Sequence, residues 1–457
     1  MVRRSLRAFL IILFLSCLKS SAQSFPISLT PYVATNPTAV VAVDINGDGK
    51  KDLVVAAGLT NLLIILTNNG AGFFTSNTAV IAGAAGIYPN SLAAADVNGD
   101  GKMDLLCPMY SRNAFNYSRL AVLTNNGAGG FASAALLVTG TNPICVTAAD
   151  INGDGWPDLI TANAGNFSQT SLSIFTNNRN GGFGSNATIN VGSQFQSGLQ
   201  WVTAADLNGD GFPDLVCACF YDATLTVLTN NGLGHFTVAS VISVPGSPTM
   251  VGVADVNGSG RPALICADTG NTTLSILTNA GGGHFATASS PNCVPSGFAG
   301  TLLISAGDLN GDGVIDLACF NETDQSVSVL TNDTMGNFTL ATRLPIGTPT
   351  FFGALADLNG DGRLDIVTDN ELTNTITILT NAGTYLPRVF VKKAPGQAIV
   401  KWPSQWSGWA GWSLQQSPDL NGNHWASYSG VTNDDGINVT VTNSDLSGNQ
   451  FFRLVHP

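Results

Sequence analysis

The sequence predicts an all-β fold: a seven-bladed β-propeller of four-stranded blades, followed by a small C-terminal β-sandwich-like domain. First, a unit of about 50 residues recurs seven times along the chain. Second, each unit contains four short runs rich in Val, Ile, Leu and Thr, bounded by Gly and Asn turns, which is typical of strands. Third, several runs are continuously apolar, as in sheets buried on both faces. Four-stranded sheets packed around an axis meet this requirement, whereas a linear solenoid would need polar capping repeats, and we find none in the sequence.

Residues 1–22 have the features of a signal peptide. Three arginines precede an apolar segment, residues 8–18, and the small residues 20–22 offer a cleavage site. The apolar segment is shorter than the roughly 20 residues that span a bilayer. A lipoprotein anchor at Cys17 is disfavoured because the residues before it form a poor lipobox. We therefore expect an exported protein, secreted or at the cell surface, without a transmembrane segment.

The net charge of the chain argues against some classes of binding partner. Removing the predicted signal peptide leaves 14 Lys and Arg against 30 Asp and Glu, a net charge of about −16. Such a charge argues against nucleic acid or an anionic membrane as the partner. Charged residues make up only 11% of the chain, whereas Gly occurs 51 times. This composition indicates many turns, as in β-rich exported proteins.

Each unit carries the motif D-x-N-x-D-G-x-x-D, or a variant of it, between its first two apolar runs. The motif begins at Asp44, Asp96, Asp150, Asp206, Asp255, Asp308 and Asp357, at steps of 52, 54, 56, 49, 53 and 49 residues. A third run ends in Leu-Thr-Asn-Asn or a close variant, and a Gly-rich turn then leads to an aromatic residue such as Phe74 or Phe131. A fourth, more polar run closes the unit.

The N-terminal segment is expected to close the ring. Residues 25–38 look like residues 338–350, which form the fourth run of unit six and lead into unit seven. Unit seven itself passes from Tyr385 into unrelated sequence. We therefore expect residues 25–34 to complete the last blade, within a propeller domain that spans residues 23–386.

The remaining residues, 387–457, form the predicted C-terminal β-domain. They contain five of the seven tryptophans, namely Trp402, Trp406, Trp409, Trp412 and Trp425. These side chains could stack on sugar rings, but a domain of about 70 residues also needs large aromatics to bury enough surface. We favour the second interpretation.

The cysteines do not predict a disulfide framework. Four of them, Cys107, Cys217, Cys266 and Cys319, share one position of the repeat. Equivalent positions in separate units do not meet, so we interpret these four as buried strand residues. The sequence leaves the pairing of Cys145, Cys219 and Cys293 open.

The chemistry of the motif indicates calcium. Side chains at its positions 1, 3, 5 and 9, with the carbonyl of position 7, can converge on one cation, and the Gly at position 6 allows a sharp turn. A set of oxygen ligands with three carboxylates suits Ca²⁺ better than Zn²⁺ or copper. An EF-hand would also need a Glu at position 12 and flanking helices, and neither is present. Solvated Asp-Gly turns without metal are the alternative, which the fixed spacing of three carboxylates disfavours.

The units resemble FG-GAP/VCBS repeats, the calcium-loop blades of integrin α-type propellers and of many exported bacterial proteins. The resemblance covers roughly residues 25–386 and rests on the loop, the Leu-Thr-Asn-Asn run and the Gly-x-Phe turn. It implies that positions 1, 3, 5 and 9 of six units bind calcium. These residues are Asp44, Asn46, Asp48, Asp52, Asp96, Asn98, Asp100, Asp104, Asp150, Asn152, Asp154, Asp158, Asp206, Asn208, Asp210, Asp214, Asp308, Asn310, Asp312, Asp316, Asp357, Asn359, Asp361 and Asp365.

Unit five departs from the pattern. Ser259 and Ala263 replace the carboxylates at positions 5 and 9, which leaves Asp255 and Asn257. With one charge in place of three, we expect no tight site there, and therefore about six calcium ions in the whole chain.

No catalytic residues can be assigned. The chain lacks the common hydrolase, zinc and nucleotide motifs, and His235 and His284, which precede repeat aromatics, are interpreted as turn residues. We expect a binding or adhesion scaffold for an extracellular protein or glycan, with structural Ca²⁺. The alternative is a lyase-like enzyme acting on polysaccharides. Basic and Tyr residues, which such an enzyme would need in a groove, are scarce, but four lie together in the longer insertion of unit two: Tyr110, Arg112, Tyr117 and Arg119. Neither the ligand nor the oligomeric state can be read from the sequence.

Overall fold

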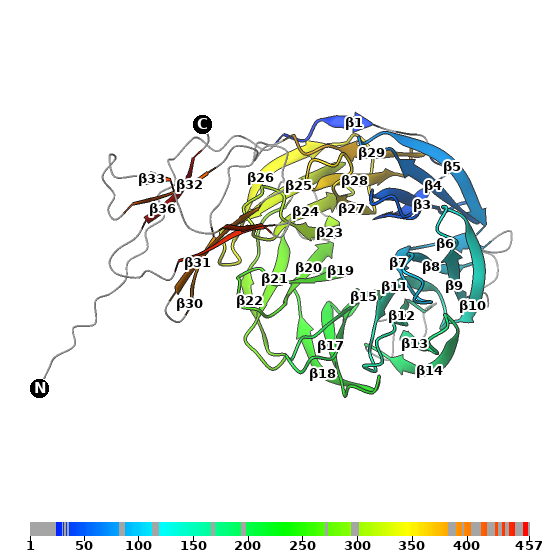
Figure 1. Ribbon diagram of the computed structural model, residues 1–457. Helices are drawn as coiled ribbons and strands as arrows, with labels where there is room; N and C mark the ends of the chain where they lie inside the picture. The colour runs from blue at the N-terminus through cyan, green and yellow to red at the C-terminus, as the bar shows by residue number, and fades with distance from the viewer. Residues whose placement is uncertain are drawn as a thin grey trace, which may run out of the picture. The chain divides into compact units, whose positions relative to one another are not determined.

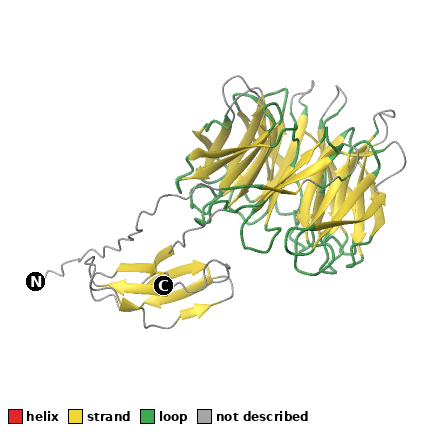
Figure 2. Ribbon diagram, turned by 90° about the horizontal axis from the view of Figure 1, so that it is seen from above, coloured by secondary structure: helices red, strands yellow, loops and turns green. Residues whose placement is uncertain are grey.

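The computed structural model describes residues 24–382, apart from 30, 32, 34–35, 82–86, 112–117, 166–169, 193–197, 270–272 and 294–300, together with seven short segments between 390 and 455. The predicted signal peptide lies outside the described residues. In the described part of the chain every regular element is a β-strand (Figure 2), and no helix there is long and apolar enough to cross a membrane. The larger of two compact units comprises residues 23–309 and 314–382.

This larger unit is a ring of seven four-stranded blades, as predicted (Figure 1). Blade one contains β2 (Pro37–Val43), β3 (Asp52–Ala57), β4 (Leu62–Asn68) and β5 (Phe74–Ile81). Blade two contains β6 (Tyr88–Pro89), β7 (Ala93–Ala95), β8 (Asp104–Tyr110), β9 (Ser118–Asn125) and β10 (Phe131–Val138), with β6 and β7 sharing the first-strand place. Blade three contains β11 (Pro143–Ala149), β12 (Asp158–Asn163), β13 (Ser171–Asn177) and β14 (Phe183–Asn190).

The remaining blades repeat this order. Blade four contains β15 (Leu199–Ala205), β16 (Asp214–Cys219), β17 (Thr224–Asn230) and β18 (Phe236–Ser243). Blade five contains β19 (Ser247–Ala254), β20 (Ala263–Thr269), β21 (Leu274–Asn279) and β22 (Phe285–Ser289). Blade six contains β23 (Thr301–Gly307), β24 (Asp316–Asn321), β25 (Ser326–Asn332) and β26 (Phe338–Pro345). Blade seven contains β27 (Gly353–Ala356), β28 (Asp365–Asn370), β29 (Thr375–Leu379) and, from the other end of the chain, β1 (Ile27–Leu29).

Burial explains the two kinds of sequence pattern. The second strands are buried at nearly every position, which explains the run of apolar or small residues that follows the first Asp in β3, β12, β16, β24 and β28. The fourth strands alternate between exposed and half-buried residues, as in β14 and β18. The first strands are only partly buried along most of their length, because they face the axis of the ring.

The N-terminal segment occupies the place predicted for it. β1 pairs antiparallel with β29, with Ile27 opposite Leu379. Four further backbone hydrogen bonds join the described residues on either side of β1 to the chain around β29, the shortest of which runs from Ala382 N to Ser24 O at 2.8 Å. Backbone hydrogen bonds therefore join the first and last parts of the propeller in one sheet.

The C-terminal residues contain two small sheets. One has the order β30 (Phe390–Ala394), β31 (Gln397–Pro403), β35 (Asn438–Asn443) and β34 (Thr432–Asp434). The other has the order β33 (Ala426–Ser427), β32 (Ser413–Ser417) and β36 (Phe451–Val455). Of the five tryptophans, Trp402 lies in β31, and the other four lie outside the described residues.

The cysteines of the propeller are core residues. All seven that the structure describes are buried, and none of these is in a disulfide. Burial raises the pKa of Cys145 to about 12 and that of Cys219 to about 11, so both thiols are protonated at neutral pH. The interpretation of the four repeat-equivalent cysteines as buried strand residues is confirmed.

A ring of asparagines joins each blade to the one before it. We call them the latch asparagines: Asn68, Asn125, Asn177, Asn230, Asn279, Asn332 and Asn381, the first Asn of each Leu-Thr-Asn-Asn run or its variant. Each donates a hydrogen bond of 2.7–2.9 Å from Nδ2 to a backbone carbonyl of the preceding blade. The accepting carbonyl always belongs to the second residue of a predicted calcium loop, a buried Ile, Val or Leu.

The latch asparagines also form hydrogen bonds within their own blades. Asn230, for example, donates a second bond to Pro213 O at 3.0 Å, and its Oδ1 accepts the amides of Gly232 and Gly234. Only Asn or Gln offers two donors and an acceptor in one neutral side chain. The requirement explains why this residue type recurs in all seven units.

Removing the closing strand should open the ring. A chain that starts at residue 36 lacks β1, so β29 becomes an exposed edge and blade seven loses its fourth strand. We expect a marked fall in the thermal midpoint relative to the chain that starts at residue 23, measured by circular dichroism. An unchanged midpoint would contradict the closure.

Substituting a latch asparagine should lower the free energy of unfolding more than substituting the residue after it. Asn230→Asp replaces two buried donors by acceptors and leaves two carbonyls without partners, which should lower the free energy of unfolding by about 2–4 kcal/mol. Asn231→Asp is the matched control, because the exposed Asn231 uses only its Oδ1, toward the amides of Leu233 and His235. Denaturant titration of both variants measures the difference, and equal losses would contradict the latch.

A buried carboxyl group in blade seven should make stability depend on pH. Asp369 is fully buried, its Oδ1 accepts the amides of Phe351 and Phe352 at 2.9 Å, and its Oδ2 has no hydrogen-bond partner. Burial raises the pKa of Asp369 to about 7. Because the folded protein holds this proton more tightly than the unfolded chain, stability should fall as pH rises from about 4 to about 7.

The substitution Asp369→Asn mimics the protonated acid. It should remove the part of the pH-dependent loss of stability that comes from Asp369, which is up to about 4 kcal/mol. Thermal unfolding at several values between pH 4.5 and pH 7.5 measures it. Asp333→Asn, at an exposed hairpin position, is the control and should retain the fall. If Asp369→Asn has the same pH profile as the parent, the carboxyl group is ionised in the fold throughout this range.

Candidate metal centres

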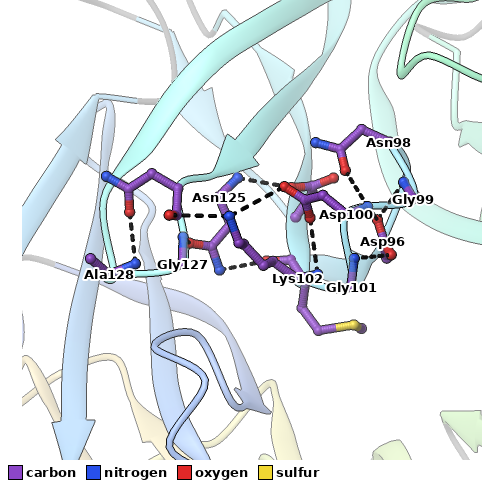
Figure 3. A network of polar contacts seen from close by, with 12 residues as sticks. Asp96, Asn98, Gly99, Asp100, Gly101, Lys102, Asn125, Gly127 and Ala128 are labelled. Atoms are coloured by element: carbon purple, nitrogen blue, oxygen red, sulfur yellow. Dashed lines mark hydrogen bonds and ion pairs between the residues drawn. The ribbon is translucent and has the colours of Figure 1, made fainter.

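The loop after β7 shows how the motif folds (Figure 3). The two carboxylate oxygens of Asp96 accept the amides of Gly99 and Gly101 at 2.7 and 2.8 Å, and Asn98 Oδ1 accepts the amide of Asp100 at 3.0 Å. Asp100 Oδ1 in turn accepts the amide of Lys102 at 3.0 Å. Gly99 and Gly101 have φ of 73° and 79°, a region that side chains disfavour. The sequence thus winds into successive side-chain turns whose carboxylates bend back over the loop.

The same turns recur around the ring. The first Asp accepts at least two loop amides in the loops that begin at Asp44, Asp96, Asp150, Asp206, Asp255 and Asp357. The third-position Asn accepts the amide two residues on in all seven loops, including Asn310 in the loop that begins at Asp308. The loops therefore present one repeated arrangement of oxygen atoms.

In six of the seven loops the ninth-position Asp lies beneath the loop, at the start of the second strand. Asp52 is fully buried, and its two oxygens accept the amides of Ile45 at 3.1 Å and Asn68 at 2.7 Å. The same pair of bonds forms at Asp104, Asp158, Asp214, Asp316 and Asp365. This Asp therefore ties its loop to the latch asparagine of the same blade, a structural role that the sequence did not reveal.

Electrostatics make these buried carboxylates sensitive to a nearby positive charge. Burial is the main reason that the pKa of Asp52 is raised, and the carboxylates of Asp48 and Asp44 raise it further. The same combination raises the pKa of Asp104 and Asp158, and that of Asp365 to about 6. A cation placed among the three carboxylates would offset both the repulsion and part of the cost of burial.

The donor set fits Ca²⁺. Each loop of six units offers three carboxylates and one amide oxygen within nine residues, with no nitrogen or sulfur ligand. Among the described residues, no three Asp, Glu, His or Cys side chains already converge as a preformed metal site, because the loop carboxylates are turned toward backbone amides. A carboxylate oxygen that accepts one amide can still accept a second contact, so both roles are compatible.

Basic side chains already neutralise some loops in part. The fifth-position carboxylates of Asp48 and Asp100 lie 3.6 Å from Lys50 Nζ and Lys102 Nζ. Asp154 pairs with Arg179 at 3.3 Å and Asp361 with Arg363 at 3.5 Å. These pairs remain partly exposed to solvent, so each contributes little to stability, and a divalent ion could displace them.

Loop five forms the same turn with fewer charges. The amides of Ser259 and Gly260 bond to Asp255 at 3.0 and 2.7 Å, although Ser259 and Ala263 replace two carboxylates. The latch contact from Asn332 to Val256 O is also retained, at 2.7 Å. Turn geometry and inter-blade contact therefore depend on backbone hydrogen bonding, and not on the number of carboxylates.

The histidine, tyrosine and arginine residues considered for catalysis lie at the following places in the fold. His235 and His284 lie in the hairpins before the fourth strands, where their carbonyls accept the amides of Asn231 and Ala280, as expected of turn residues. Of the Tyr and Arg candidates in blade two, Arg112 and Tyr117 lie outside the described residues, and Tyr110 contacts Tyr88 edge to face.

Sequence reasoning missed the latch asparagines as partners of the loops. The available signal was their constancy, since this Asn occupies the same position in all seven units while the residue after it is Asn, Ala or Asp.

Solved structures share the fold at low sequence identity. BBS1N, crystallised in complex with ARL6DN, superposes with a TM-score of 0.56 and 12% identity, over 80% of this chain and 100% of that one. A protein from Lactobacillus plantarum gives a TM-score of 0.52 and 12% identity, over 91% and 98% of the two chains. Such similarity concerns the fold alone. No curated protein matches the sequence.

The repeats themselves identify the family. The FG-GAP-like repeat matches residues 44–107, 110–161, 153–217, 206–266, 255–319 and 308–368. The FG-GAP repeat matches residues 88–129. The matched segments include all seven loops and extend over well more than half of the chain. The chain therefore belongs to the FG-GAP repeat family of β-propeller proteins.

Proposed function

We propose that this protein is an exported, calcium-stabilised propeller that serves as a binding or adhesion scaffold for an extracellular protein or glycan. Residues 1–22 direct export, and residues 387–457 form an accessory β-sandwich-like domain. The observation that carries the proposal is the repetition of one oxygen-rich loop in six of seven blades, always between the first and second strands. Because the strands alternate in direction, these loops share one face of the ring.

Calcium has a structural role in this proposal. Six ions would add twelve positive charges and bring the net charge from about −16 to about −4. They would be held by positions 1, 3, 5 and 9 of the six complete loops. Each ion would relieve repulsion within its loop, so metal binding should stabilise the folded state.

The binding surface is assigned to the loop face. The hairpins between the third and fourth strands open on the same side as the calcium loops, and they expose Phe73, Leu233 and Met335 at 66–70% of their full accessibility. Exposed apolar side chains beside oxygen-rich loops are suited to a partner with both apolar and polar groups. No arrangement of acid and base among the described residues favours a lyase over a binding protein.

Calcium removal should destabilise the protein, and the ions should be countable. We expect EDTA to lower the thermal midpoint at pH 7.5 and excess CaCl₂ to restore it, with six ions bound as measured by native mass spectrometry. Asp210→Ser, which gives loop four the fifth residue of loop five, should reduce the count to five. The double change Ser259→Asp and Ala263→Asp should raise it to seven. Indifference to EDTA would contradict a structural role for calcium.

A glycan array and a panel of extracellular matrix proteins would test the scaffold function, with a parallel assay for polysaccharide cleavage. We expect binding without turnover. Replacing Phe73, Leu233 and Met335 together by Ser should abolish it. The matched control replaces Leu59, Tyr221 and Leu372, which are exposed in turns of the opposite face. Turnover, or equal loss with both triple variants, would overturn the proposal.

A further inference from the structure

The axis of the propeller is filled unevenly. The fifth residue before each loop lies on the first strand in five blades, between β6 and β7 in blade two, and directly before β27 in blade seven. Six blades place this residue against the central cavities. Blades four to seven contribute bulky residues, namely Trp201, Met250, Leu303 and Phe352. Blades one and two contribute Ala39 and Ser91. One side of the axis is therefore crowded, and the other is open.

Trp201 is held in place across two blades. Its Nε1 donates to Thr203 Oγ1 at 3.0 Å, and that hydroxyl donates to Val251 O of β19 at 2.7 Å. The indole packs against the apolar cores on both sides of blade four and against the core around Leu303 of blade six. The Trp201 side chain therefore forms a fixed wall of the central cavity.

A cavity of about 540 Å³ remains between this wall and the small residues of blades one and two. Its sides include Val41, Ala94, Ala306, Ala354 and Leu355. The volume lies within the range of small-molecule sites, roughly 300–1,000 Å³. Apart from two serines, one side chain of the lining is polar, and that is Lys51.

Lys51 has no equivalent in the other blades. It occupies position 8 of the first calcium loop, where the other loops have Met103, Pro157, Pro213, Pro262, Ile315 and Leu364. Its neighbour Lys50 pairs with Asp48, whereas no ion pair within 4.0 Å is found for Lys51 among the described residues. The cavity thus combines apolar walls with a single cation, in a chain of strongly negative charge.

We propose that this cavity binds an amphiphilic carboxylate, with an alkyl or aryl body against the apolar first strands and the carboxylate against Lys51 Nζ. The ammonium group would select an anion, and the walls would select its apolar body. The site uses neither the calcium ligands nor the exposed residues of the loop face. The proposed ligand site therefore goes beyond the proposed scaffold function. An experiment can contradict either proposal without contradicting the other.

Isothermal titration with octanoate and with 1-octanol tests the site in the calcium-loaded protein. We expect one octanoate per chain, bound more tightly than the neutral alcohol. Lys51→Met, which introduces the residue of blade two, should weaken octanoate about two- to fivefold and leave octanol unchanged. Lys102→Met is the control, because Lys102 lies on an equivalent loop outside the cavity, and it should change neither.

Two variants test the apolar walls separately from the charge. Ala94→Leu and Ala354→Leu each fill part of the cavity and should weaken both ligands, with thermal midpoints close to that of the parent protein. Absence of octanoate binding to the parent would overturn the proposal. So would an equal effect of Lys51→Met on octanoate and octanol, or octanoate binding unchanged in both filling variants.

Discussion

The propeller depends on how one buried residue in each loop satisfies its backbone. The second residue of every calcium loop is an Ile, Val or Leu with at most 1% of its surface exposed, so water cannot reach its amide or carbonyl. In six blades the amide donates to the buried Asp of its own blade, and in all seven the carbonyl accepts from the latch asparagine of the next blade. An unpaired buried backbone group costs as much as a lost hydrogen bond. Two side chains from adjacent blades therefore fix each loop in place.

This arrangement separates the architecture of the ring from the binding of metal. Blade five has Ala263 instead of the buried Asp, yet Asn279 still reaches Leu207 O and Val256 O still receives Asn332. The ring is continuous through a blade in which two of the three loop carboxylates are replaced, by Ser259 and Ala263. Under the proposed function, calcium would tighten loops that hydrogen bonds already position, and an individual loop could lose metal ligands without loss of the fold.

The sequence predicts those features that repeat within a unit, and it misses those that depend on how units face one another. Strand number and the loop turns follow from local periodicity and Gly positions, and the closing segment follows from the likeness of residues 25–38 to residues 338–350 of another unit. The latch role of Asn68 or Asn125 does not, because its acceptor lies in another blade about 80 residues away or, for Asn68, near the far end of the chain. Likewise, Asp52 reads as a calcium ligand from spacing alone, and only its burial shows that it also supports the loop from below. The uneven axis became visible once the register of each first strand was known.

The pairing of β1 with β29 also sets the order in which the protein can mature. The paired residues Ile27 and Leu379 are about 350 positions apart, so β1 is synthesised before every other strand of the propeller and has no partner until almost the entire ring exists. Until then an edge strand at each end stays unpaired and open to other chains. For the exported protein that we propose, this delay means that the final sheet cannot close before the last blade has been synthesised.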